Sequence, residues 1–180
     1  MSTEPVRLMH YDPRWRQEFE QTRSSILFSC DGWVTGVHHI GSTAISGLIA
    51  RPTIDVIATV ESDQAIGNAT SLIEGLNFRS VDTPLWADGA QTLIKPRHLS
   101  AEDSDVTHRI FLVVHKASNL PSMMLGRCTL VRDYLIANPE VAIELEERKV
   151  SIWREQSGDF AAYQQTKADF FSSLQDRIDG

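Results

Sequence analysis

Residues 38–44 read HHIGSTA, and residues 52–57, a short distance further along the chain, read PTIDVI. The first stretch ends a β-branched and aromatic run over 33–40 that predicts a strand, and Gly41-Ser42 ends that strand before a short helical turn at about 44–48. The second stretch begins a strand over 53–60 whose Ile and Val content is typical of burial on both faces. A strand that leads through Gly-Ser into a helix N-terminus is a candidate anion site, because the N–H groups there lack intrahelical acceptors.

The Gly-Ser turn allows two interpretations. Gly41 permits a phosphate to approach the backbone closely, and Ser42 and Thr43 add hydroxyl donors. An ordinary strand-to-helix turn, with Ser or Thr as the N-cap, would contain the same residues. The local pattern by itself favours the ordinary turn.

Asp55 shifts the balance, because it interrupts an otherwise apolar strand. A buried carboxylate without a partner is costly, so Asp55 needs a cation or a ligand. One explanation is an ion pair with Arg51 or another basic residue. The other is contact with a metal or substrate at the end of the strand.

The remaining pattern predicts an α/β or α+β domain with a helical C-terminal third. Asp12-Pro13 predicts the start of a helix that runs to about residue 30, with Asp12 as the N-cap. A helix over 63–76 and strands over 91–99 and 106–115 follow, and three helices then begin near residues 119, 139 and 159. Short connections favour one domain over 1–180, with a sheet part at about 1–116 and a helical part at about 117–180.

Composition restricts the classes of partner. A formal charge of −7 argues against binding to long nucleic acids. The longest apolar run, residues 110–114, is too short to span a membrane. Cys30 and Cys128 have no metal-ligand spacing, and two isolated thiols fit a reducing compartment. Because the N-terminus has no apolar signal segment, we expect a cytoplasmic protein that binds no membrane; its oligomeric state is left open.

Several motifs resemble those of the GrpB family, which is assigned to the nucleotidyltransferase superfamily. They are YDPRW at 11–15, HIGSTA at 39–44 with GL at 47–48, RPTID at 51–55, RDYL at 132–135, NPE at 138–140, and Tyr163 with Lys167. The resemblance implies a nucleotidyltransferase-like mixed sheet flanked by helices. It also implies a Gly-Ser turn that holds nucleotide phosphates, and aspartates on the next strands that hold two divalent metals.

The sequence departs from the superfamily pattern in its acidic residues. Where a D-h-D pair is expected, Ile57 stands in the second position, and the later strand over 107–111 carries no carboxylate. Relatives in the family carry His-h-His where this chain has Arg109 and Phe111, while His108 is expected on the opposite strand face. Two-metal catalysis needs more than one carboxylate. Asp55 is therefore expected to hold at most one Mg²⁺, the expected cofactor, through a ligand's phosphates.

Basic residues at apolar-stripe positions suggest a shared anionic target. Lys95 and Arg97 are expected on one strand face, and Lys167 lies four residues after Tyr163 on an apolar helix face. Each basic residue taken alone could also be explained by an aliphatic side-chain stem that lies along apolar surface while the charged group stays in water. The expected phosphate- or nucleotide-binding residues are His39, Gly41, Ser42, Thr43, Arg51, Lys95, Arg97, Arg109, Arg132 and Lys167, with Asp55 as the candidate metal ligand.

Three functions remain open at this level, and no catalytic residue is assigned. The favoured one is a nucleotidyltransferase-fold protein with a degenerate metal site that binds a nucleotide or another phosphorylated small molecule in a cationic cleft. The second is an active Mg²⁺-dependent nucleotidyl or phosphoryl transferase, for which two of the three expected carboxylates are missing. The third is a protein-interaction module accessory to a nucleotide- or coenzyme A-handling enzyme, because domains similar to this family occur fused to dephospho-CoA kinase.

Overall fold

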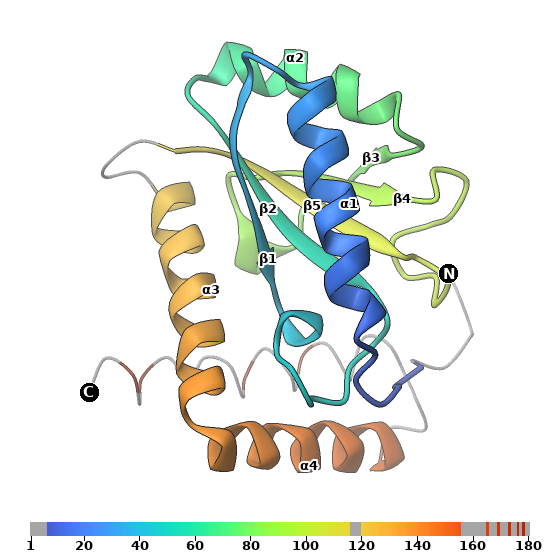
Figure 1. Ribbon diagram of the computed structural model, residues 1–180, viewed down its shortest axis with the longest axis vertical. Coiled ribbons are helices and arrows are strands. Elements are labelled where there is room, and N and C mark those ends of the chain that lie inside the picture. Colours follow the sequence, from blue (N-terminus) through green and yellow to red (C-terminus); the bar gives the residue numbers. More distant parts are fainter. Residues whose placement is uncertain are drawn as a thin grey trace.

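The strands on either side of the Gly-Ser turn lie next to each other in a five-stranded mixed sheet (Figure 1). In the spatial order β1-β2-β5-β4-β3, the strands are β1 (Val34–Ile40), β2 (Ile54–Val60), β5 (His108–Val114), β4 (Gln91–Lys95) and β3 (Arg79–Val81). β2 and β5 run parallel, and the other neighbouring pairs are antiparallel. The expected mixed α/β fold with a helical C-terminal part is thereby confirmed.

This computed structural model describes residues 7–115 and 120–155, and five single residues of the C-terminal segment. Those five are Gln165, Asp169, Ser173, Asp176 and Ile178. Lys167, and most of the helix expected from Asp159, lie outside the described residues. Within the described part, no helix is both long enough and apolar enough to cross a membrane.

One face of the sheet is covered by α1 (Arg14–Ser29) and α2 (Asp63–Glu74). Alternation along β2 and β5 sends Val56 and Ile110 to this face, where they pack with Phe19 and Ile26 of α1 and Ile73 of α2. The apolar residues whose spacing predicted these two helices are therefore the ones that the helices bury against the sheet.

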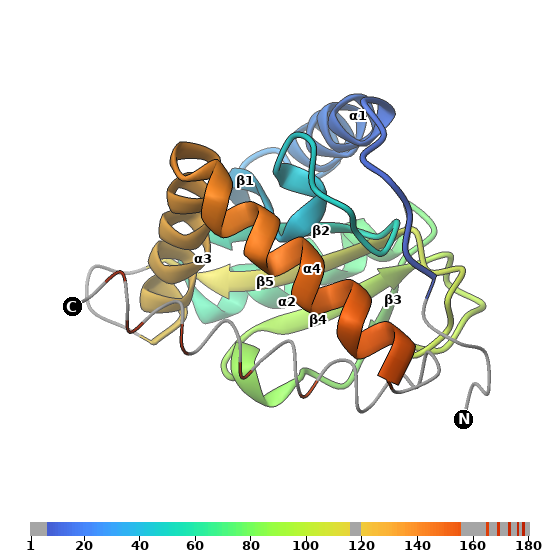
Figure 2. The same ribbon diagram turned by 90° about the horizontal axis from the view of Figure 1, so that it is seen from below.

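The other face is covered by α3 (Leu120–Ala137), whose Leu125 packs against Ile57 and Phe111. α4 (Pro139–Glu155) then turns across the end of the sheet at which β1 stops (Figures 1 and 2). Leu145 of α4 packs there against Leu48, in the loop that follows the Gly-Ser turn. α4 therefore covers the segment that follows the Gly-Ser turn, beyond the end of the sheet.

Local side-chain contacts lie at the starts of the first two helices. α1 begins at Arg14 with Pro13 as its N-cap residue and no side-chain cap, so the expectation of Asp12 as the N-cap is corrected by one residue. Asp12 Oδ1 accepts the backbone N–H of Arg14 at 2.9 Å, and the Arg14 side chain, which pairs with the same carboxylate, lowers the pKa of Asp12. The Ser62 Oγ accepts the N–H of Ala65 at 3.2 Å, so Ser62 is the N-cap of α2.

Three expectations about local structure need correction. β4 ends at Lys95, because Pro96 has no N–H with which to continue the ladder, so the expectation that Lys95 and Arg97 share a strand face is wrong. The helical turn after Gly41 is η1 (Ser42–Ala44), earlier than the expected 44–48. The strand β3 was not expected; it is a three-residue edge strand, too short to show an alternating pattern.

His108 lies on the face opposite Arg109, as the alternation predicts. It is buried and makes an edge-on ring contact with Phe78, a member of the core beneath α1 and α2. Burial lowers the pKa of His108 to about 4. This histidine belongs to the core.

Candidate functional site

The Gly-Ser turn lies directly against Asp55. Gly41 has φ 73° and ψ −171°, a conformation that only glycine adopts readily. A Cβ built on Gly41 would lie 3.0 Å from Asp55 Oδ2. Glycine is therefore required here both for the backbone conformation and for the close approach of the turn to the carboxylate.

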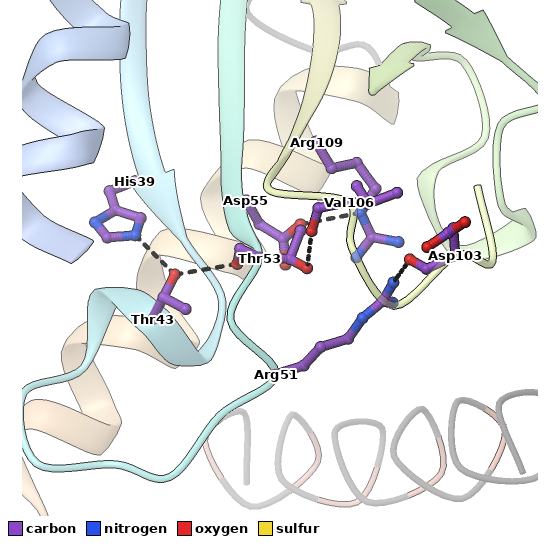
Figure 3. Close-up of polar contacts among 8 residues, drawn as sticks. All are labelled: His39, Thr43, Arg51, Thr53, Asp55, Asp103, Val106 and Arg109. Carbon is purple, nitrogen blue, oxygen red and sulfur yellow. Dashed lines mark hydrogen bonds and ion pairs between the residues drawn. The ribbon is translucent and has the colours of Figure 1, made fainter. Parts of the chain in front are cut away.

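Hydrogen bonds hold the turn to the strands on both sides (Figure 3). The Thr43 hydroxyl donates to the Thr53 carbonyl at 3.4 Å, and His39 Nε2 lies 2.9 Å from the same Thr43 oxygen. Because the Thr43 hydrogen is used toward Thr53, the His39 Nε2–H is the donor in the second bond. Both threonines are buried, so this network fixes the position of the turn.

His39 is a neutral group at pH 7. Its ring stacks on Phe19 of α1 with centroids 4.6 Å apart. Burial is the main cause that lowers the pKa of His39 to about 4; the Asp55 charge opposes this shift and the Arg132 charge adds to it. His39, one of the expected site residues, thus contacts both Thr43 of the turn and Phe19 of α1. The ring supports the turn from the α1 side.

Asp55 forms an ion pair with Arg109 (Figure 3). The two residues are register partners on the parallel strands β2 and β5, and Arg109 Nε donates to Asp55 Oδ1 at 2.9 Å. The Arg109 guanidinium also lies over the Phe111 ring, 5.1 Å from its centroid. Of the two explanations for this carboxylate, the structure contains the ion pair, with Arg109 in place of Arg51.

The residues around Asp55 do not fit a two-metal site. Ile57 and Phe111, which follow Asp55 and Arg109 on the same face, supply no ligand atom. Asp88 and Glu61, two acids outside β2 and β5, are exposed, and no three His, Cys, Asp or Glu side chains of the described residues group to hold a metal. Cys128 packs onto this face from α3, and burial raises the pKa of its thiol to about 11.

Lys149 is the site residue that the sequence analysis missed. This α4 lysine is 1% exposed, and its Nζ donates to the Ser42 Oγ and, at 3.3 Å, to the Ile49 carbonyl. A signal was available: Lys149 follows the buried Val141 and Leu145 at successive four-residue steps. This signal, a cation at an apolar-stripe position of a helix, is the same one that predicts Lys167 as a site residue.

Arg132 reaches the turn from α3. Its Nη1 donates to the His39 carbonyl at 3.0 Å, and its Nε donates to Asp133 Oδ1 at 2.9 Å. Together with Arg109 and Lys149, Arg132 brings the cations of three separate elements to the Gly-Ser turn. Only Asp55 and Asp133 offset them among the residues just described.

The other expected cations lie elsewhere. The Arg51 Nη2 donates to the Asp103 carbonyl at 2.9 Å, so its guanidinium extends to the loop before β5 (Figure 3). Lys95 is the register partner of His108 in the β4–β5 ladder, and its Nζ lies 5.9 Å from the centroid of the Phe78 ring. Lys95 is therefore on the sheet face opposite Asp55. Arg97 follows the end of β4. The structure therefore brings Arg109 and Arg132 to the turn and leaves Lys95 and Arg97 away from it.

Comparisons with known proteins identify relatives along the whole chain. The family model described as GrpB protein matches residues 5–177. UPF0157 protein YqkA of Bacillus subtilis is 23% identical over 171 residues, which are 95% of this chain and 46% of that protein. Dephospho-CoA kinase of Mycobacterium tuberculosis is 29% identical over 186 residues, which are 93% of this chain and 44% of that protein. The chain spans less than half the length of either relative.

A solved structure has the same fold. The crystal structure of the conserved protein GrpB from Enterococcus faecalis matches with a TM-score of 0.81 over 96% of both chains, at 21% sequence identity. The matched family model covers the motifs at the Gly-Ser turn, on β2 and on α3. The chain therefore belongs to the GrpB family, and its fold is consistent with the nucleotidyltransferase superfamily.

Proposed function

We propose that this protein binds a nucleotide or another phosphorylated small molecule at a cationic cleft beside the Gly41-Ser42 turn, without nucleotidyl transfer. The observation that carries the proposal is the gathering of Arg109, Arg132 and Lys149 around a turn of the type that binds phosphate in the superfamily. Each cation comes from a different element. Such convergence favours an anionic ligand, because cations close together repel one another unless anions offset them.

The carboxylates support binding over transfer. Two divalent metals close together need several acidic ligands to stabilise both the attacking and the leaving oxygen. Asp55 is the single acid of the strand pair β2 and β5, and its charge is already offset by Arg109. Binding that depends on protein cations is the function that this charge arrangement favours.

A thermal-shift panel tests the proposal. Nucleoside mono- and triphosphates, dephospho-CoA and inorganic phosphate are each added with Mg²⁺ and with EDTA. A true ligand at about 100 times its Kd should stabilise the folded protein by ~2.7 kcal/mol, and the stabilisation should survive EDTA. If no phosphorylated compound raises the midpoint, the proposal is wrong. If turnover appears that needs Mg²⁺ and is lost in Asp55→Asn, the protein is a transferase.

A pair of serine variants controls for the position of the site. Ser42→Ala removes the hydroxyl that Lys149 contacts, and we expect a confirmed ligand to bind it at least about tenfold more weakly. Ser46→Ala changes an exposed serine of the same loop and should leave affinity unchanged. Equal affinities for the two variants would place the ligand elsewhere.

A second candidate function rests on the alignment with dephospho-CoA kinase, which covers 93% of this chain and 44% of that protein. We propose as the alternative that this domain acts as an accessory to a coenzyme A-handling enzyme. Co-sedimentation with a separate dephospho-CoA kinase domain is the test. A stable complex without any ligand-induced thermal shift would favour the accessory role.

A further inference from the structure

The cation that offsets the charge of Asp55 is part of the protein chain. The Arg109 Nε lies 2.9 Å from Asp55 Oδ1, and the two side chains are only 19% and 15% exposed. The pairing follows from strand register, because Asp55 and Arg109 are direct partners in the β2–β5 ladder. The guanidinium therefore occupies the space beside Asp55 Oδ1, on one side of the carboxylate, where a divalent cation bound to that oxygen would lie.

A divalent cation at this carboxylate would be disfavoured for two reasons. It would lie close to the guanidinium, and two like charges that are shielded from water repel strongly. It would also find few ligands, because Ile57 and Phe111 occupy the neighbouring positions on the same face. Mg²⁺ normally needs carboxylates as well as phosphate oxygens and water.

Arg109 still has donors to offer. Nε is engaged with Asp55, and within residues 7–115 and 120–155 neither terminal nitrogen of the guanidinium makes a hydrogen bond. The planar group is oriented by Asp55 on one side and by the Phe111 ring, 5.1 Å away, on another. An arginine held in this way suits forked contact with two oxygens of one phosphate.

We propose that Arg109 serves in place of a metal, so that the site takes a phosphate group that is free of divalent cation, such as a phosphomonoester, and rejects the Mg²⁺ complex of a nucleoside triphosphate. This inference rests on the proposed function. It adds the class of ligand and the residue that selects it. In this arrangement, Mg²⁺ competes with the protein for the phosphate oxygens.

Isothermal titration calorimetry with adenosine monophosphate and adenosine triphosphate, each with Mg²⁺ and with EDTA, tests the selection. We expect the monophosphate to bind equally in both conditions and the triphosphate to bind at least about tenfold more weakly with Mg²⁺. Tighter triphosphate binding with Mg²⁺ would overturn the inference and leave the proposed function standing. No binding of either nucleotide in either condition, together with no thermal shift from any compound of the panel above, would overturn both.

A measurement without nucleotide tests the role of Arg109 independently. Mn²⁺ added to the protein should keep the full electron paramagnetic resonance signal of the free ion, because Arg109 already offsets the charge of Asp55. Loss of that signal in wild type, but not in Asp55→Asn, would show a metal at Asp55 and refute the inference.

Variants of Arg109 separate charge from geometry. Arg109→Gln should weaken monophosphate binding at least about tenfold, and Arg109→Lys, which keeps the charge but loses the forked donors, should restore only part of the affinity. Arg16→Gln, at an exposed α1 position, is the matched control and should bind as wild type does. If the Gln variant does not fold, as judged by circular dichroism, the Lys variant carries the test. Wild-type affinity in Arg109→Lys would mean that charge alone is sufficient and would overturn the forked contact.

Discussion

Gly41 is the residue on which the geometry of the turn depends. Its backbone conformation is one that costs residues with a Cβ about 1–3 kcal/mol, and a Cβ would also meet Asp55 Oδ2 at 3.0 Å. We predict that Gly41→Ala lowers the free energy of unfolding by about 3 kcal/mol or more, as measured by urea denaturation.

Gly47→Ala is the matched control for that substitution. Gly47 also has a positive φ, 84°, but a Cβ there would meet no atom within 4 Å. Its replacement should cost only the backbone strain, about 1 kcal/mol. Equal costs for the two variants would show that contact between the turn and Asp55 contributes nothing to stability.

Lys149 joins α4 to the turn through one buried ammonium group. We predict that Lys149→Met lowers the free energy of unfolding by about 1–3 kcal/mol, because the buried Ser42 hydroxyl and the partly buried Ile49 carbonyl lose a charged donor. The exposed neighbour on the same helix, Arg148, is the control, and Arg148→Met should change stability by less than about 0.5 kcal/mol. Urea denaturation of both variants measures the difference, and a Lys149→Met protein as stable as Arg148→Met contradicts the prediction.

At the scale of elements, helix starts follow local chemistry and can be tested one by one. Ser62 caps α2 by accepting the Ala65 N–H at 3.2 Å. We predict that Ser62→Ala costs about 1 kcal/mol of unfolding free energy, measured by thermal or urea denaturation.

The control for the cap is a serine inside the same helix. Ser71 is exposed in the body of α2, so Ser71→Ala should be neutral or slightly stabilising because Ala has the higher helix propensity. A destabilisation as large as that of Ser62→Ala would mean that the effect is unrelated to capping.

For the whole molecule, one buried and one partly buried histidine predict a stability that falls in mild acid. His39 and His108 lie on different strands, and burial lowers the pKa of each to about 4. An unfolded chain takes up these protons near pH 6.5, whereas the folded protein takes them up only near pH 4. The stability is therefore fully present above pH 6.5 and decreases as the pH falls toward 4.

Urea denaturation at pH 7.5 and at pH 5 measures this effect. Each histidine should contribute a loss of about 2 kcal/mol at pH 5, where most carboxylates are still ionised. His39→Gln and His108→Gln should each reduce the difference between the two pH values by about that amount. A wild-type stability that is the same at both pH values would contradict the prediction.

Local sequence predicted some elements of the fold and missed others. The continuous apolar runs of β2 and β5, the stripes of α1 and α2, and the contact of Asp12 with the Arg14 N–H all depend on residues close together in the chain. Elements with weak local patterns were missed or misplaced: β3 has only three residues, and Pro96 ended β4 earlier than expected. The position of the Gly-Ser turn was predictable because glycine and a strand end both leave a local signal.

By itself, the sequence determined the family, the mixed α/β fold and the loss of the acidic metal ligands, because each depends on residue types at short, fixed spacings. Only the tertiary structure decided which charges meet. Asp55 and Arg109 are 54 residues apart, and Ser42 and Lys149 are 107 apart. Strand register and helix packing, which combine contacts from the whole chain, brought them together and left Lys95 on the far face of the sheet. Periodicity predicts which face of its own element a side chain occupies, but its partner depends on how the elements pack.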